Sequence, residues 1–339
     1  MRNMLKLLAD KLRSGEDIVM VTVIASSGST PRGAGSRMLI SKDGRIAGTI
    51  GGGAVEYRSQ QIAAQVLEEK KSGEHDFSLT REDVQNLGMI CGGAVKVFFK
   101  YIPANDEEIL SLCEKAEEFF ALGEDMWLIS DIADDGRLGL YTKSAGYYGI
   151  DAPDWLKEKL TRHPLRQIWE GRDMYEEQIC SSGIVYVFGG GHVAQELVPV
   201  LNHVGFRCVV LDDRPEFASE ALFPAAEKVI LCDFEHISDY ISITEEDYCC
   251  VMTRGHSFDT TVQAQLLLTP ACYIGVIGSK HKKKGVYQRL VEEFGIEESQ
   301  LDRITSPIGL SIKAETPAEI AISIAGQMIE LRAIRTENQ

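Results

Sequence analysis

Two glycine-rich segments near the amino terminus are places where a ligand could meet the backbone closely. The first, 26–35, contains Arg32 within Thr-Pro-Arg-Gly, and the second runs into Glu56 at the start of an expected helix. The second contains three consecutive glycines: Gly51, Gly52 and Gly53. Glycine permits close approach of the backbone, and the Arg32 guanidinium adds a planar cation. Glu56 has a second interpretation, which is compensation of the helix dipole.

A third glycine turn carries a thiol. Cys91 lies in Gly-Met-Ile-Cys-Gly-Gly, 88–93, before an expected strand, and its setting favours exposure. We therefore expect Cys91 to be a reactive or metal-facing sulfur, with burial as the alternative. The eight cysteines include no CxxC pair, which indicates a reduced, cytoplasmic protein. Four cysteines in apolar runs are expected to be buried: Cys208, Cys249, Cys250 and Cys272.

A glycine fingerprint opens the C-terminal half. The apolar run 184–188 leads into Gly189-x-Gly191-His192-x-Ala, and Asp212 follows 23 residues after Gly189. Such a turn offers free N–H groups at a helix start to a phosphate, and Asp212 could accept from ribose hydroxyls. That pattern favours NAD over NADP, although Arg214 weakens the exclusion. The alternative is that the glycines serve only helix–strand packing.

Further polar loops are expected on the same side of the predicted sheet, because all follow carboxyl ends of parallel strands. They span 253–259, 278–284 and 306–309, and four of their residues are candidate ligand contacts: Arg254, His256, Ser279 and Lys280. Cations at a helix start are tolerated more readily beside an anion, although a solvated basic turn is equally consistent. His256 and Asp259 could form an acid–base or ligand pair, whereas Asp259 alone fits a helix-start carboxylate.

The elements around these loops predict two kinds of fold. Five apolar runs alternate with helical patterns at 258–268 and 283–294, which predicts a Rossmann-like, doubly wound parallel sheet over 183–339. Thr316, Pro317 and Glu319 form a capping box at the start of the last helix. The five runs are 184–188, 208–211, 228–231, 248–252 and 272–277.

Residues 1–104 predict an α+β domain instead. Its expected elements are a helix over 1–12, strands over 18–25, 37–40, 45–50 and 94–101, and a helix over 55–71.

The middle segment, 105–182, contains two short motifs that also occur in the N-terminal domain. Gly-Glu-Asp at 15–17 recurs at 123–125, and Asp-Gly-Arg at 43–45 recurs at 135–137. We expect a degenerate repeat that packs with the N-terminal domain and lacks its glycine-rich loop, with chance similarity of Asp-Gly turns as the alternative. We expect the stretch 146–182 to be a segment that connects two domains.

Charge and hydropathy exclude several classes of protein. The 339 residues carry a formal net charge of −16, which argues against coating nucleic acid or an anionic membrane. Apolar residues make up 44% of the chain, enough for a buried core, and no stretch of about 18 apolar residues predicts a membrane span. The amphipathic start lacks the apolar centre of a signal peptide. An anionic ligand would need a local concentration of positive charge.

Taken together, these motifs resemble the XdhC/CoxI family over about 18–101 and 183–330. The resemblance rests on several segments in matching order: 26–56, 88–93, 188–194, 211–215, 252–256, 277–279, 306–310 and 316–320. It implies an accessory factor that binds the molybdenum cofactor (molybdopterin) and delivers it to a xanthine dehydrogenase-type molybdoenzyme, with a cofactor sulfurase as a further partner. It favours a cofactor-binding chaperone over a catalyst, and we expect a homo-oligomer.

Carried over by residue, the resemblance places Arg32, Glu56 and Cys91 at the cofactor, with molybdenum facing Cys91. It assigns the Rossmann-like domain to a nucleotide or pterin phosphate. The family commonly has cysteine where this chain has Ala54, which leaves Cys91 as the candidate sulfur. The main alternative is an NAD-dependent oxidoreductase, and another is a scaffold whose glycine loops are structural.

Overall fold

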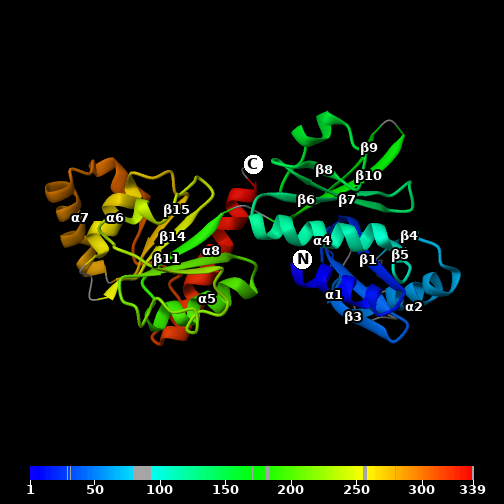
Figure 1. The fold of residues 1–339 in the computed structure, drawn as a ribbon, viewed down its shortest axis with the longest axis horizontal. Coiled ribbons are helices and arrows are strands. Elements are labelled where there is room, and N and C mark those ends of the chain that lie inside the picture. The colour runs from blue at the N-terminus through cyan, green and yellow to red at the C-terminus, as the bar shows by residue number, and fades with distance from the viewer. Residues whose placement is uncertain are drawn as a thin grey trace. The chain divides into compact units, whose positions relative to one another are not determined.

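The computed structural model describes residues 1–28, 30, 32–78, 93–169, 171–180, 183–254, 258–278 and 280–337. The chain divides into two compact units, Met1–Ser181 and Ser182–Asn338, which we call unit 1 and unit 2. Figure 1 shows the two units, and each is described by itself below.

The first half of unit 1 is a five-stranded antiparallel sheet with helices on both faces. The strand order is β3-β2-β1-β5-β4. Alternate residues of the strands pack against α1 and α4 on one face, and against α2 on the other. The elements are α1 (Arg2–Arg13), β1 (Ile18–Ser27), β2 (Arg37–Ser41), β3 (Gly44–Thr49), α2 (Gly53–Glu69), β4 (Gly73–Ser78) and β5 (Ala94–Ile102).

The second half of unit 1 has the same strand order as the first. Its sheet runs β8-β7-β6-β10-β9, which is the order of the first sheet when the strands of each half are numbered from one. Helix α4 precedes it as α1 precedes the first sheet, and lies between the two sheets in Figure 1. The elements are α4 (Glu107–Leu122), β6 (Met126–Asp131), β7 (Arg137–Thr142), β8 (Gly146–Tyr148), η1 (Asp154–Glu158), β9 (Leu165–Trp169) and β10 (Arg172–Cys180).

The expectation that 146–182 only connects two domains is wrong, because this stretch holds three strands of the second sheet. Charged residues in β9 and β10 interrupt the alternation of apolar and polar residues by which a strand is predicted from sequence. Arg166 donates to Asp173 across the two strands, with Nε 2.9 Å from Oδ1, and Gln167 Nε2 lies 2.9 Å from Glu176 Oε1. Cross-strand polar pairs of this kind stabilise a sheet without apolar alternation.

Strand register shows which residues of the two halves are equivalent. Thr22 pairs with Arg37 in the first sheet, and Ser130 pairs with Leu138 in the second. Gly35 and Gly136 therefore occupy nearly the same place, before the second strand of each sheet. The Asp-Gly-Arg echo was wrongly aligned, because residues 43–45 lie in the β2–β3 hairpin whereas 135–137 lie between β6 and β7.

The contacts between the two halves are reciprocal. A Cβ at Gly136 would overlap the ring of Phe98, and a Cβ at Gly35 would lie 3.8 Å from Tyr175 Oη. Phe98 and Tyr175 are themselves equivalent, since Phe98 pairs with Thr22 and Tyr175 with Ser130. Reciprocal contacts between equivalent positions are the pattern of a two-fold interface, as expected of a duplicated unit.

Unit 2 is the predicted doubly wound domain. Its six parallel strands have the order β13-β12-β11-β14-β15-β16. Helices α5 and α8 cover one face and α6 and α7 the other, so the strands bury alternate residues in two separate cores. The strands are β11 (Ile184–Phe188), β12 (Arg207–Asp212), β13 (Lys228–Leu231), β14 (Tyr248–Val251), β15 (Tyr273–Val276) and β16 (Ile304–Thr305). The helices are α5 (His192–His203), η2 (Ile237–Asp239), α6 (Asp259–Leu267), α7 (Lys280–Phe294), η4 (Glu298–Arg303) and α8 (Pro317–Glu337).

Two local predictions are confirmed in unit 2. The capping box of α8 is present, with Glu319 N 3.3 Å from Thr316 Oγ1 and Thr316 N 3.0 Å from Glu319 Oε2. Cys208, Cys249 and Cys250 are buried, and burial raises the pKa of each thiol, to about 12 for Cys250. Cys272 is half-buried. Among the helices described, none is long and apolar enough to cross a bilayer.

Candidate functional site

Three connections leave the first sheet of unit 1 at the same end. Ala94, at the start of β5, pairs with both Ser27 and Ser78, where β1 and β4 end. Arg37, at the start of β2, pairs with Thr49, where β3 ends. The segments 28–36, 50–52 and 79–93 therefore all begin and end at one edge of the sheet, which we call the loop end. Sequence reasoning placed its glycine motifs in these same three segments.

The second sheet has short connections at two of the three equivalent places. Residues 132–136 join β6 to β7, and 170–171 join β9 to β10, where the first sheet has 28–36 and 79–93. The length of the connections 28–36 and 79–93 is thus a property of the first half, whereas the connection between β8 and β9, 149–164, is long in the second half. Loops that exceed what a scaffold needs are common carriers of function.

The buried carboxylate of Glu56 is hydrogen-bonded to the backbone of the loop end. Its carboxylate accepts from the backbone N of Ile50 and of Gly52, each at 3.2 Å, and from the Thr49 hydroxyl. Arg45 Nη1 lies 2.7 Å from Glu56 Oε1. Burial opposes ionisation, but these bonds outweigh it and hold the pKa of Glu56 below its ordinary value. The buried carboxylate is therefore ionised, and the charge of Arg45 neutralises it. Its oxygens already accept hydrogen bonds from the chain itself.

The remaining loop-end candidates are more open. Arg32 is exposed. The three glycines at 51–53 all have positive φ, and a Cβ at Gly52 would meet nothing within 4 Å. Other residues would be strained in this backbone, and a ligand has open space beside Gly52, although the N–H groups of Gly51 and Gly52 are donated to Thr49 and Glu56. Cys91 lies outside the described residues, within which no group of three or more His, Cys, Asp or Glu could hold a metal ion.

In unit 2 the glycine turn after β11 serves two purposes. Gly189 has φ +112°, and a Cβ there would collide with the Met252 carbonyl, so this glycine allows close packing. Gly191, at the start of α5, has only open space around its Cβ position, and His192 beside it is exposed. The helix start is therefore accessible at Gly191 and His192, whereas Gly189 is required by the fold itself.

Asp212 is fully committed to bonds within its own chain. It is buried, and accepts from Gly190 N at 2.6 Å and from Arg214 through N, Nε and Nη2 at 3.0, 2.9 and 2.9 Å. Burial opposes ionisation, but these donors hold the pKa of Asp212 below its ordinary value. Arg214 is itself stacked on Phe217, 3.8 Å from the ring centroid. A ribose hydroxyl could bond to Asp212 only if Arg214 moved away.

The other predicted residues of unit 2 are only partly described. Arg254 is exposed just after β14, and Lys280 begins α7. His256 and Ser279 lie outside the described residues, so the predicted pairing of His256 with Asp259 is not visible. Asp259 is buried at the start of α6 and accepts from the Thr253 hydroxyl.

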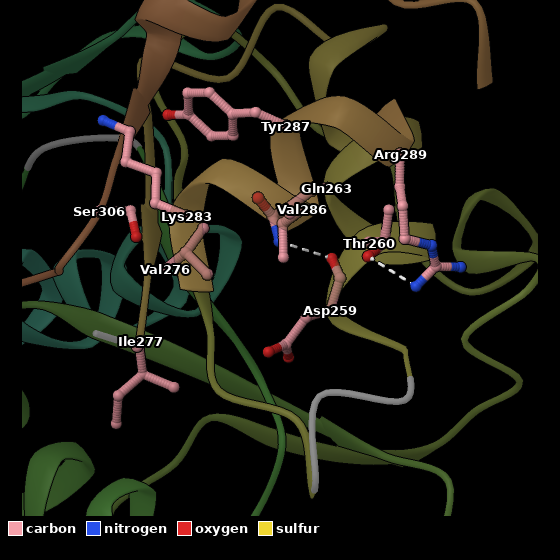
Figure 2. A pocket seen from close by; sticks show the side chains of 12 residues that line it. Asp259, Thr260, Gln263, Val276, Ile277, Lys283, Val286, Tyr287, Arg289 and Ser306 are labelled. Atoms are coloured by element: carbon pink, nitrogen blue, oxygen red, sulfur yellow. Dashed lines mark hydrogen bonds between the residues drawn. The ribbon is translucent and has the colours of Figure 1, made fainter. Parts of the chain in front are cut away.

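A cavity of about 350 Å³ lies beside β15, between α6 and α7. Figure 2 shows side chains from both helices around it. Its wall from α6 is polar and buried, whereas Val276, Ile277 and Val286 are apolar. Sequence reasoning named Asp259 and the loop 278–284, which includes Lys283, but missed Gln263 and the cavity itself, because spacing along the chain does not show which side chains of α6 and α7 face one another. The lining residues from α6 and α7 are Asp259, Thr260, Gln263, Lys283, Gly285, Val286, Tyr287 and Arg289.

Comparison with known proteins identifies relatives of both units. The XdhC and CoxI family matches residues 11–78, and the XdhC Rossmann domain matches 185–328. A protein of Bacillus subtilis strain 168, named as a probable subunit of xanthine dehydrogenase, is 28% identical over 338 residues, covering 98% of each chain. An uncharacterized protein of Escherichia coli K12 is 23% identical over 92% of this chain, but only 43% of that protein is covered. A crystal structure described as a xanthine dehydrogenase from Bacillus halodurans superposes with a TM-score of 0.78, at 26% identity, covering 98% of this chain and 96% of that one.

Proposed function

The chain belongs to the XdhC and CoxI family, and on that premise we propose that it is an accessory factor of a xanthine dehydrogenase-type molybdoenzyme. In this proposal it binds the molybdenum cofactor and delivers it to the apoenzyme, without turnover of its own. The naming of its Bacillus relatives supports the link to xanthine dehydrogenase.

One observation carries the proposal. Three glycine-containing connections start from the loop end of the first sheet, and the second half of unit 1, with the same strand order, has short connections where the first has 28–36 and 79–93. A scaffold alone would not need the length of these two connections, because the second half keeps the same strand order without it. This difference favours a ligand at the loop end over a purely structural role for the glycines.

The residues of the loop end fit an anionic, phosphorylated group. Exposed Arg32 supplies a guanidinium, and the open space beside Gly52 lets a ligand approach the chain closely, although the Gly52 N–H is already donated to Glu56. The carboxylate of Glu56 does not repel an anion, because Arg45 neutralises it. When bound, the cofactor would supply a molybdenum centre held by a pterin dithiolene. The chain's own contribution would be to hold the group and shield it.

The test is transfer of the cofactor to an apo-xanthine dehydrogenase. The wild-type protein should co-purify with molybdenum, bind molybdopterin with micromolar or tighter affinity, and activate the apoenzyme. Arg32→Ala should weaken cofactor binding roughly tenfold or more, since a charge-assisted hydrogen bond is lost.

The matched control is Lys42→Ala, which removes an exposed cation at the opposite end of the same sheet, in the β2–β3 turn. It should leave binding and activation unchanged. Equal effects of the two substitutions would contradict a site at the loop end. Loss of activation by Arg32→Ala with unchanged cofactor binding would point to enzyme docking instead.

The alternative of an NAD-dependent oxidoreductase keeps some support from the strand order of unit 2, which is that of dinucleotide-binding domains. The occupation of Asp212 by Arg214 and Gly190 disfavours it. Titration with NAD decides between the two: tight NAD binding without molybdopterin binding would refute the accessory role.

Several finer expectations remain predictions. They are a homo-oligomeric state, a cofactor sulfurase as a second partner, a cytoplasmic location and a sulfur–molybdenum contact at Cys91. A Cys91→Ser protein that activates the apoenzyme as well as wild type would remove the last of them.

A further inference from the structure

The connection that carries Arg32 ends in a turn, residues 33–36, that is bonded to β1. Gly35 N donates to the carbonyl of Val23 at 2.9 Å, and Val23 N donates to the carbonyl of Ser36 at 2.8 Å. The turn therefore has a fixed place on the first sheet, and Arg32 immediately precedes it. Whatever holds this turn also limits where the guanidinium of Arg32 can reach.

The second half of unit 1 contributes one member of a buried ion pair next to the turn. Arg37, the first residue after the turn, has Nη1 2.5 Å from Glu177 Oε1, and both side chains are 5% exposed. Arg37 Nε donates to the hydroxyl of Thr22 in β1, at 3.1 Å. In β10, the hydroxyl of Tyr175 donates to Glu177 Oε2, also at 3.1 Å. A carboxylate held on the second sheet thus fixes the end of the connection that carries Arg32.

Close packing holds the same turn. Gly35 has φ +91°, and a Cβ there would lie 3.0 Å from Glu177 Oε2 and 3.2 Å from Pro164 Cγ, so the second half contacts its backbone directly. Ala34 packs against an apolar cluster to which both halves contribute. The members of this cluster are Ile24, Phe98, Ile132 and Tyr175.

The ion pair occurs on one side of the interface between the halves. Strand register makes Arg37 equivalent to Leu138, and Glu177 equivalent to Lys100. The equivalent contact, at a short connection of the second half, therefore has a lysine and a leucine, which cannot form an ion pair. Burying two charges is costly and seldom adds net stability. A pair found only at the long connection 28–36 favours a role in that connection over a role in joining the halves.

We propose that Glu177 is a positioning residue of the loop end. Through its ion pair with Arg37 and its contact with Gly35, it holds the turn 33–36 and so orients Arg32 towards an anionic ligand. Glu177 is buried, so it acts through the turn and does not itself contact the ligand. The inference rests on the proposed function, because that proposal places the anion beside Arg32. The second half then serves to orient a connection of the first.

The test is a double-mutant cycle on molybdopterin binding by the full-length protein. Glu177→Gln keeps the shape of the side chain but leaves Arg37 buried without its counter-charge, so the turn should shift. Alone, this substitution should weaken binding about fivefold. In an Arg32→Ala protein it should weaken binding by less than about twofold, because the residue through which it acts is gone. Equal losses in the two backgrounds, or no loss in either, would overturn the proposal.

Leu156→Ala is the matched control for loss of stability. Leu156 is 1% exposed and packs on the opposite face of the second sheet, in a cluster that contains no residue of the turn. The substitution should lower the unfolding midpoint and leave molybdopterin binding unchanged. If Leu156→Ala weakens binding as much as Glu177→Gln does, the effect of Glu177 is one of stability and the proposal is wrong.

Tyr175→Phe serves the same cycle should Glu177→Gln not fold. It removes only the hydroxyl that donates to Glu177 Oε2, and keeps the ring packed against Ala34. Binding should weaken about threefold in the otherwise wild-type protein and remain unchanged in the Arg32→Ala protein. An unchanged affinity in both would overturn the proposal.

Backbone hydrogen exchange separates this inference from the proposed function, because it needs no ligand. The amides of Gly35 and Ser36 should exchange about tenfold faster in Glu177→Gln than in the wild type. If the wild type binds no molybdopterin but this exchange is faster, the accessory role fails and the anchoring of the turn by Glu177 is supported. If the wild type binds molybdopterin but Glu177→Gln changes neither binding nor exchange, the inference fails and the proposed function stands.

Discussion

Two carboxylates that the sequence presents as ligand contacts are bonded within their own chain. Glu56 and Asp212 each follow a glycine motif, and each accepts from backbone N–H groups of that motif and from an arginine. The sequence predicts that both contact a ligand, and that role stays a prediction. Their partners, Arg45 and Arg214, were not identified, because arginine pairing depends on side-chain direction that periodicity does not specify.

Asp212→Asn should destabilise unit 2. The substitution removes a buried charge that Arg214 and Gly190 require, with an expected loss of about 3 kcal/mol in unfolding free energy. Asp213→Asn is the matched control, since its side chain is 34% exposed, and should change stability by less than about 0.5 kcal/mol. Chemical denaturation of both variants measures the difference. Similar losses for the two would show that the buried network contributes little.

Glu176 gives unit 1 a pH dependence. Burial raises the pKa of Glu176 to about 7, against an ordinary 4.5, and its Oε2 has no hydrogen bond among the described residues. The folded protein therefore holds this proton more tightly than the unfolded chain. Its contribution is fully favourable below pH 4.5, declines as pH rises to about 7, and is constant above.

Glu176→Gln should therefore increase stability at pH 8 by about 3 kcal/mol and change it little at pH 4.5. Exposed Glu158→Gln, in η1, is the control and should have no such pH-dependent effect. Thermal unfolding across this pH range makes the comparison. A Glu176→Gln protein that keeps the wild-type slope would contradict the assignment.

Among the elements, apolar strands were predictable and polar ones were not. Five of the six parallel strands of unit 2 read as apolar runs, and the sequence predicts their bounds within a residue or two. Four of the five are buried, and β13 is partly exposed. The two-residue strand β16 was not predicted. Strands β9 and β10 carry ion pairs and were missed. The repeat was visible in Gly-Glu-Asp, but its second motif was misaligned because an Asp-Gly turn fits more than one hairpin.

The interface between the halves of unit 1 depends on Gly136. Gly136→Ala combines a positive φ with overlap of the Phe98 ring, and should cost about 2 kcal/mol or more. Gly44→Ala is a close control, because Gly44 also has positive φ but faces open space. It should cost about 1 kcal/mol. Denaturation curves of the pair separate packing from backbone strain, and equal costs would mean that the Phe98 contact is unimportant.

At the scale of the whole molecule, each unit has hydrophobic clusters of its own. Among the described residues, the clusters of unit 2 contain residues of unit 2 only, and those of unit 1 contain residues of unit 1 only. Calorimetry should therefore resolve two unfolding transitions. Asp212→Asn should lower the midpoint of one and Gly136→Ala that of the other. A single transition lowered by both substitutions would show that the units unfold together.

The ion pairs show where positive charge remains available in a chain whose net charge is −16. Many of the basic side chains form ion pairs with carboxylates, as Arg45, Arg214 and Arg289 do. Lys283, by contrast, lines its cavity without an ion pair in the described part of the chain. The charge of the whole chain repels polyanions at long range. A small anion can still be bound where an unpaired cation remains.

The reciprocal contacts of Gly35 with Tyr175 and of Gly136 with Phe98 bear on binding stoichiometry. The two halves share a strand order and an interface, but the second has short connections where the first has 28–36 and 79–93. The loop-end site proposed above therefore predicts saturation at one ligand per chain. A titration that reached two ligands per chain would place a second site in the other half.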